Sequence, residues 1–249
     1  MDEGYWKYFL EIHKDMPRQG SGRDRYTQKA FDMIPKIKHP KILDIGCGPG
    51  LQTIKLAKLS DGEVIGIDIV QQYLDQLQQL IKKEKLQDRV KAVNQSMTDI
   101  KYPEKSFDII WSEGSIFIMG FEHGLREWKK YLKPNGFIAV HDMAWIKNNP
   151  PPEILEYWEK VYPDIAKIKD AIKIINKCGY NLLGYFPLPK DAWWEFYYTP
   201  LQKRINKFKK SYQNNPIAMQ LIKQEEEEIA MFEKYNSWYG SVFYIMQIS

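Results

Sequence analysis

Short apolar runs alternate with amphipathic stretches through the middle of the chain. The apolar runs predict buried strands at 42–45, 63–68, 89–94, 107–111 and 137–140. Between them, apolar residues at helical spacing predict helices at 51–60, 71–85 and 121–132. This alternation indicates a parallel sheet covered on both faces by helices. With two later strands at 180–186 and 238–248, we expect a doubly wound α/β sheet of seven strands, the last one antiparallel.

Helical segments flank this expected core. Residues 1–40 show helical spacing in two parts, separated by a break at 17–22 that contains proline and glycine, and predict an N-terminal helical cap. After three prolines at 150–152, helices are expected at 153–161 and 164–178. Residues 190–236 have no glycine and predict a helical insertion. The chain is therefore interpreted as one domain, with a core at 41–189 and 237–249, the cap, and the insertion as a lid.

Composition narrows the class of protein. Of 249 residues, 44% are hydrophobic and 27% charged, which is typical of a globular protein and excludes a disordered or collagen-like chain. A net charge of +4 neither requires nor excludes an anionic partner. Cys47 and Cys178 are far apart and lack metal-ligand spacing, so we expect reduced thiols, no metal site and a cytoplasmic protein. We expect neither a signal peptide nor a membrane span.

A glycine-rich loop carries the main chemical signal. Residues 46–50 (GCGPG) follow a strand and precede a helix, and glycines there let a ligand approach the backbone. The spacing departs from the GxGxxG of NAD-binding loops. Asp68 ends the second strand, 22 residues after Gly46, where a carboxylate can accept hydrogen bonds from a ribose diol. Its alternative role is to cap the following helix.

Over residues 41–142 the sequence resembles the class I S-adenosylmethionine-dependent methyltransferases. The resemblance lies in segments 43–50 (LDIGCGPG), Asp68, 106–110 (SFDII) and 131–137 (YLKPNGF). It implies a Rossmann-like fold, S-adenosyl-L-methionine as cofactor and methyltransferase activity. The expected cofactor-binding residues are Asp44, Gly46, Cys47, Gly48, Gly50, Asp68, Ile69, Ser96, Met97 and Ser112, with Arg18 from the N-terminal segment. Ser96 departs from the family, in which an Asp often precedes the hydrophobic residue at the adenine.

A narrower resemblance covers nearly the whole chain and points to a little-characterised bacterial group of small-molecule-type methyltransferases. It rests on 18–20 (RQG), 111–115 (WSEGS), 120–122 (GFE), 127–128 (EW), 130–132 (KYL), Trp145, Trp193, Glu195, Tyr197 and 239–240 (YG). It implies the fold, the cofactor and a small-molecule acceptor, and it names no particular acceptor.

Methyl transfer is an in-line displacement, so holding donor and acceptor in line supplies most of the acceleration. A general base is needed only where the acceptor must first lose a proton. Glu113, just past the fourth strand, is the catalytic candidate, and its alternative role is to orient the loop. His123, His141 and Asp142 are interpreted as structural or solvated.

The insertion opens with five aromatic residues and one carboxylate at 193–198, which we interpret as a lid over the acceptor that also packs against the sheet. The expected substrate-pocket residues are Trp145, Trp193, Glu195 and Tyr197. With Glu113 and Glu195 in one aromatic enclosure, the acceptor would be neutral or cationic. Residues 18–20 would form a second lid.

Two charge runs in the insertion bear on the alternatives. The basic residues at 203–210 and the acidic run at 225–228 are interpreted as solvated helix faces rather than as a nucleic-acid surface. The place after the fourth strand also lacks the Asn/Asp-Pro-Pro-aromatic motif of enzymes that methylate exocyclic base amines. The sequence therefore predicts a small-molecule methyltransferase. The alternatives are an RNA or protein methyltransferase and a catalytically silent S-adenosylmethionine-binding protein. The sequence indicates no membrane partner and no oligomeric state.

Overall fold

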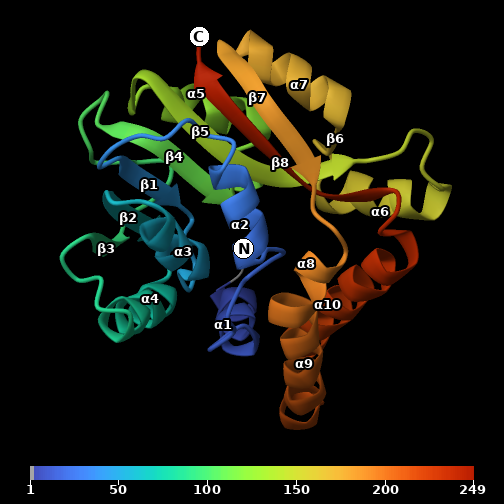
Figure 1. Ribbon diagram of the computed structural model, residues 1–249. Coiled ribbons are helices and arrows are strands. Elements are labelled where there is room, and N and C mark those ends of the chain that lie inside the picture. The colour runs from blue at the N-terminus through green and yellow to red at the C-terminus, as the bar shows by residue number, and fades with distance from the viewer. Residues whose placement is uncertain (1–2) are drawn as a thin grey trace.

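A single mixed sheet organises the computed structural model, which describes residues 3–249 (Figure 1). Its main strands are β1 (Lys41–Ile45), β2 (Glu63–Asp68), β3 (Val90–Asn94), β4 (Phe107–Glu113), β5 (Leu132–Trp145), β7 (Tyr180–Pro187) and β8 (Tyr239–Ile248). They lie in the order β3-β2-β1-β4-β5-β8-β7. β1 to β5 pair in parallel, and β8 is antiparallel to both β5 and β7. The predicted doubly wound sheet with an antiparallel last strand is confirmed.

The sheet has one strand more than the seven predicted. The two-residue strand β6 (Ala166–Lys167) pairs with the end of β5 and lies where a helix was expected to begin. Two residues are too few to show a period of two, so the pattern could not reveal this strand. β5 is also longer than predicted, because its pairing with β4 already begins at Leu132.

Helices cover both faces of the sheet, as expected for buried parallel strands. Their bounds are α1 (Glu3–Ile12), α2 (Asp24–Phe31), α3 (Leu51–Leu59), α4 (Gln71–Lys83), α5 (Phe121–Lys129), α6 (Pro152–Val161) and α7 (Ile168–Lys177), with a 3₁₀ turn η1 (Ile116–Ile118). Neighbouring residues of β1 divide between the two cores. Ile42 packs in the core that holds α2, α3 and α4, and Leu43 in the core that holds α5 and α7.

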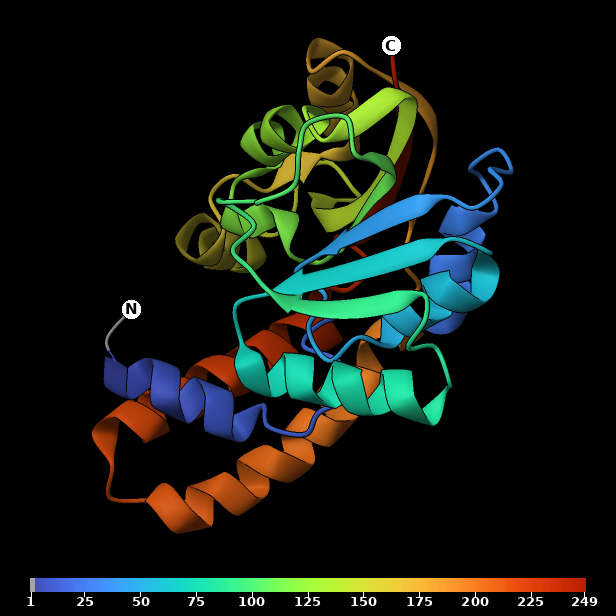
Figure 2. The same cartoon turned by 90° about the vertical axis from the view of Figure 1, so that its left-hand side faces the viewer.

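The predicted helical insertion consists of four pieces. They are α8 (Asp191–Trp193), the π-helical turn η2 (Trp194–Tyr198), α9 (Thr199–Tyr212) and α10 (Pro216–Tyr235). The side chain of Asn215 caps α10 by accepting a hydrogen bond from the Ala218 N–H at 2.9 Å. α1 packs on both α9 and α10, so the N-terminal cap and the insertion lie together on one side of the sheet (Figure 2).

No described helix is long and apolar enough to cross a membrane.

Candidate active site

The glycine-rich loop joins β1 to α3 and bends through the left-handed region at Gly48 and Gly50, with φ of 52° and 89°. A Cβ on Gly50 would lie 2.3 Å from the Leu77 side chain, so packing against α4 demands glycine there. The space beside Gly48 is different. Among the described residues, a Cβ at Gly48 would meet only the Gln19 Cγ, at 4.0 Å. The loop backbone at Gly48 is therefore open to a ligand.

Asp68 fastens this loop to the start of α4. Its Oδ2 accepts a hydrogen bond from the Gly48 N–H at 2.9 Å, and its Oδ1 accepts one from the Val70 N–H at 2.9 Å. Burial raises the pKa of Asp68, and these backbone hydrogen bonds partly offset the rise. Each carboxylate oxygen has two lone pairs, so both oxygens can accept one further hydrogen bond. Asp68 thus orders the helix start and keeps capacity for a ligand diol.

Asp44 lies fully buried near the end of β1. Its Oδ2 accepts a hydrogen bond from the Thr53 hydroxyl at 2.6 Å, whereas its Oδ1 has no hydrogen-bond partner within residues 3–249. Burial raises the pKa of Asp44 to about 7. Leaving a buried acceptor unpaired costs about 1–3 kcal/mol, which a donor from a ligand would remove.

Arg18 and Glu113 lock the N-terminal segment onto the end of β4. The Arg18 Nη1 donates to the Glu113 Oε2 at 2.8 Å, and both side chains are buried, with 5% and 1% exposed. The other oxygen, Oε1, accepts from the Thr27 hydroxyl at 2.7 Å and the Trp111 indole N–H at 3.0 Å. Burial raises the pKa of Glu113, but Arg18 and its other partners outweigh burial and lower it overall. A carboxylate so engaged is a weak base.

Arg18 has donors left over. Its Nε and Nη2 are buried and have no hydrogen-bond partner in the described part of the chain. These two nitrogens form one edge of the guanidinium, which suits a carboxylate held by two parallel hydrogen bonds. The charge of Arg18 also lowers the pKa of Asp44, so the two side chains interact electrostatically.

Three further residues expected to bind the cofactor, Ile69, Ser96 and Met97, lie after the ends of β2 and β3. Ile69 follows Asp68 and is 61% exposed. The Ser96 hydroxyl bonds the Thr98 hydroxyl at 2.8 Å, and the Met97 carbonyl accepts from the Trp128 indole N–H at 3.3 Å.

Ser112 and Cys47 lie inside the protein. The Ser112 hydroxyl bonds the Ser115 hydroxyl at 2.7 Å, which donates to the Ile45 carbonyl at 2.8 Å. A Cβ on Gly46 would lie 2.3 Å from the Ser115 Oγ, so Ser115 packs directly against the loop, and Ser112 holds Ser115 in place through their hydrogen bond. Burial raises the pKa of the Cys47 thiol well above its usual value, and the thiol is therefore unreactive.

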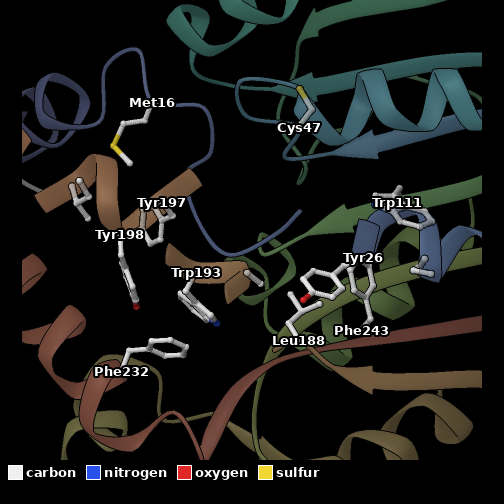
Figure 3. Close-up of a cluster of buried hydrophobic side chains, with 14 of the residues drawn as sticks. Met16, Tyr26, Cys47, Trp111, Leu188, Trp193, Tyr197, Tyr198, Phe232 and Phe243 are labelled. Carbon is white, nitrogen blue, oxygen red and sulfur yellow. The ribbon is translucent and has the colours of Figure 1, made fainter. Parts of the chain in front are cut away.

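Three of the four expected substrate-pocket residues, Trp145, Trp193 and Tyr197, belong to one buried cluster, and Glu195 does not. Trp193 packs on Tyr198 and Phe232, with ring centroids 5.3 and 4.6 Å away (Figure 3). Tyr197 is buried beside them, and Trp145 packs on Tyr239. These aromatic side chains therefore form the interior of the insertion and its junction with β8.

Glu195 lies apart from the aromatic interior. It is half exposed and pairs with Arg23. The expected enclosure that holds both Glu113 and Glu195 is therefore not formed.

Three neighbouring candidates match their structural interpretation. His141 is buried 3.9 Å from the Glu113 Oε2, and burial lowers its pKa to about 4, so the ring is neutral. Asp142 accepts from the Tyr162 hydroxyl at 2.8 Å, and burial raises its pKa to about 6. His123 lies exposed in the first turn of α5.

Glu225 was missed by the sequence interpretation. It is 7% exposed in α10, so the expectation that residues 225–228 form a solvated face is wrong at this position. The signal was available in the spacing of the buried residues of α10, which include Ala218, Ile222, Glu225, Ile229 and Phe232. Steps of three and four residues place Glu225 on the apolar face of the helix.

Comparison with known proteins agrees with this geometry. Residues 42–136 match a family model described as a methyltransferase domain. This part of the chain is a class I methyltransferase domain. The chain is 31% identical to 27-O-demethylrifamycin SV methyltransferase of Amycolatopsis mediterranei over 133 residues, which are 53% of this chain and 48% of that protein. It is 28% identical to methyltransferase GfsG of Streptomyces halstedii over 142 residues, 57% of this chain and 50% of that one. The chain thus spans about half the length of these relatives.

The methyltransferase fold extends beyond the matched residues. A crystal structure of an S-adenosylmethionine-dependent methyltransferase from Geobacter sulfurreducens, in complex with S-adenosyl-L-homocysteine, superposes with a TM-score of 0.83 at 14% identity. The match covers 98% of each chain. The two proteins therefore share one architecture, helical cap and insertion included.

Proposed function

We propose that this protein transfers a methyl group from S-adenosylmethionine to a small-molecule acceptor. The observation that carries the proposal is the pair of unsatisfied buried groups beside the glycine loop. The Asp44 Oδ1 lacks a donor and the Arg18 Nε and Nη2 lack an acceptor among residues 3–249. An α-amino acid end offers an ammonium group to the first and a carboxylate to the second. S-adenosylmethionine has such an end.

The remaining parts of the cofactor also find suitable residues. Asp68 would accept from the ribose hydroxyls, because both of its oxygens keep a free lone pair. Ile69 and Met97 would offer apolar contact to the adenine. When bound, the cofactor supplies a methyl group on a sulfonium, which is electrophilic without help from a metal or an acid.

The protein's own residues then orient the reactants and exclude water. We propose Glu113 as a positioning residue rather than a base, because three hydrogen bonds to Arg18, Thr27 and Trp111 occupy it and its pKa is low. By holding Arg18 and α2, Glu113 keeps the N-terminal segment over the loop. An acceptor with its own lone pair, such as a neutral amine, needs no base in this arrangement.

The cap and insertion support a small acceptor over a large one. α1, α9 and α10 pack together on one side of the sheet (Figures 1 and 2). One of the relatives named above, 27-O-demethylrifamycin SV methyltransferase, has a small-molecule acceptor in its name. A macromolecular acceptor would require a more open approach to the loop.

Label transfer tests the proposal. The full chain is incubated with methyl-labelled S-adenosylmethionine and, separately, with an amine and phenol library, total RNA and a denatured protein extract. We expect label only in the low-mass fraction, and much less of it with Asp68→Ala at a low concentration of S-adenosylmethionine. Label in RNA or protein would contradict a small-molecule acceptor and identify a macromolecular one instead. Failure to bind S-adenosylmethionine would remove the function altogether.

A further inference from the structure

Four consecutive glutamates of α10 divide between two environments. Glu226 pairs with Lys209 at 2.6 Å, and Glu227 is exposed. Glu225 and Glu228 are three residues apart, so they share the opposite face of the helix. Glu225 is buried, and Glu228 is half-buried. Two carboxylates thus point toward the protein interior from one helix.

Neither carboxylate has a lysine or arginine partner in the part of the chain that the structure describes. The nearby Arg204 donates to the backbone carbonyls of Glu11 and Ile12 at the end of α1 instead. The charged group of Arg204 therefore completes a helix end. It leaves the carboxylates of α10 without a counter-ion.

A second, independent group points to the same place. His13, from the segment after α1, is 1% exposed, and its Nε2 lies 3.7 Å from the Glu225 Oε1, too far for a hydrogen bond. Within residues 3–249 the His13 Nε2 has no hydrogen-bond partner, and neither does the Glu225 Oε2. Burial lowers the pKa of His13 to about 4, so the ring is neutral and supplies no counter-charge. Two buried polar groups from different elements thus remain unsatisfied side by side.

Tyrosines surround this pair of carboxylates. The Tyr198 hydroxyl donates to the Glu228 Oε1 at 3.0 Å. Burial raises the pKa of each neighbouring tyrosine, and one or both carboxylates raise it further, at Tyr5, Tyr73, Tyr157, Tyr197 and Tyr198. The charge of Asp68 also raises the pKa of Tyr73, and the Tyr73 hydroxyl has no hydrogen-bond partner among the described residues. The cluster therefore adjoins the proposed cofactor site through α4.

We propose that Glu225, Glu228 and the tyrosines around them form a subsite for an organic cation, namely an ammonium group of the methyl acceptor other than the atom that receives the methyl group. The identification of this cation as part of the methyl acceptor rests on the proposed function. Aromatic faces and carboxylates both attract positive charge, and a cation there would satisfy the unpaired oxygen of Glu225. The same surroundings repel an anionic acceptor.

Binding of a cation changes the protonation of the subsite. Burial and Glu228 raise the pKa of Glu225 well above its usual value, which favours its protonated form when no cation is bound. A bound ammonium favours the ionised carboxylate, and the proton leaves to solvent. The titratable groups that face this carboxylate are Glu228 on α10, Tyr5 on α1, His13 after it, Tyr73 on α4, Tyr157 on α6 and Tyr197 on η2. The charge of Arg204 on α9 acts on His13.

Three aromatic probes of similar size and different charge test the subsite. Benzylammonium, benzyl alcohol and benzoate are titrated by calorimetry into the full chain loaded with S-adenosyl-L-homocysteine. We expect benzylammonium to bind at least about tenfold more tightly than the alcohol, and benzoate to bind most weakly. Repeating the titration in two buffers of different ionisation enthalpy should show proton release. Equal affinity for the cation and the alcohol would overturn the proposal.

A matched pair of variants assigns the effect to one carboxylate. Glu225→Gln should lose at least about tenfold in benzylammonium affinity, whereas Glu227→Gln, with the same charge change on the exposed side of α10, should lose none. Unchanged affinity in a folded Glu225→Gln would contradict the proposal. If that variant does not fold, the probe series on the unaltered chain decides alone.

The outcome is separable from that of the proposed function. S-adenosyl-L-homocysteine is titrated first, without any probe. Cofactor binding without a preference for benzylammonium would remove the cation subsite and leave the methyltransferase proposal standing. The chain could instead fail to bind S-adenosyl-L-homocysteine and still show a cation preference that depends on Glu225. That result would remove the methyltransferase proposal and leave the cation subsite standing.

Discussion

Arg18 and Asp44 are the main evidence for cofactor binding. Each forms hydrogen bonds with some of its polar atoms, while the others, the Arg18 Nε and Nη2 and the Asp44 Oδ1, have no partner among residues 3–249. The Arg18 Nη1 is bound to Glu113 and the Asp44 Oδ2 to Thr53, so both side chains are held in place. The free edge of each is therefore pre-positioned rather than mobile, and a ligand that fits pays little ordering entropy. The resemblance to known methyltransferases suggested both residues but not the contacts that hold them, since Arg18 reaches the site from a segment outside the sheet.

Arg18→Lys should lower the affinity for S-adenosyl-L-homocysteine by about tenfold or more. Lysine keeps the charge but loses the two parallel donors that suit a carboxylate. An analogue without the amino-acid carboxylate should bind the variant and the unaltered chain equally, as measured by calorimetry. The control is Arg23→Lys, at the pair of surface carboxylates Asp191 and Glu195. An equal loss with both ligands would contradict the assigned contact.

Cofactor affinity should depend on pH through Asp44. Its pKa is raised to about 7 by burial, and the ammonium of the ligand favours the ionised form. Below that pH, binding must first remove a proton, so affinity for S-adenosyl-L-homocysteine should fall by up to about tenfold per pH unit. Asp44→Asn should bind more weakly and lose most of this slope. Calorimetry at several pH values measures both, and an identical slope in the two proteins would exclude Asp44.

At the scale of elements, the strands were predictable and the insertion was not. Parallel strands buried on both faces give continuous apolar runs, which is why residues 42–45 and 63–68 were placed correctly. The insertion was expected to be helical without bounds for its individual helices, and it breaks at the π-helical turn η2 and at Asn215. The break at Asn215 has a local signal, because Asn215 caps α10 and Pro216 follows it, whereas the aromatic run at η2 shows no such signal.

The buried glutamate of α10 makes a stability prediction. A carboxyl group whose pKa is raised on folding adds stability while it is protonated, and this stability declines as the pH rises above the unfolded-state value, about 4.5. Glu225→Gln removes that decline. Its free energy of unfolding, relative to the unaltered chain, should therefore be more favourable at about pH 8 than at about pH 5.

Urea denaturation at the two pH values measures this difference. Glu227→Gln is the control, because its carboxylate is exposed and should give the same relative stability at both. A constant difference for Glu225→Gln would show that this carboxyl group is ionised in the folded protein throughout.

Trp193 anchors the insertion from within. Its ring packs on Tyr198 and Phe232, and it is 6% exposed. Trp193→Ala should lower the free energy of unfolding by about 3–5 kcal/mol through loss of packing and a residual cavity. Chemical denaturation measures it. A loss below about 1 kcal/mol would mean that the ring does not hold the insertion together, and would favour a direct role at the acceptor.

At the scale of the whole molecule, the site joins segments that are distant in sequence. Tyr212 donates to Glu11 at 2.7 Å and Asn215 to the Tyr8 hydroxyl at 2.9 Å, which ties the insertion to α1 across some two hundred residues. The sequence predicted a cap and a lid separately. It could not predict that they pack on each other, because hydrophobic periodicity identifies a buried face without its partner.

The central claim is that the glycine loop and Asp68 hold S-adenosylmethionine. The most direct test is calorimetric titration of the full chain with S-adenosylmethionine, S-adenosyl-L-homocysteine and NAD. We predict one site for each of the first two ligands and none for NAD. Asp68→Ala should weaken binding at least about tenfold through loss of hydrogen bonds to a charged acceptor, and Asp75→Ala, an exposed carboxylate on α4, should not. Binding of NAD alone, or unchanged affinity in Asp68→Ala, would contradict the account.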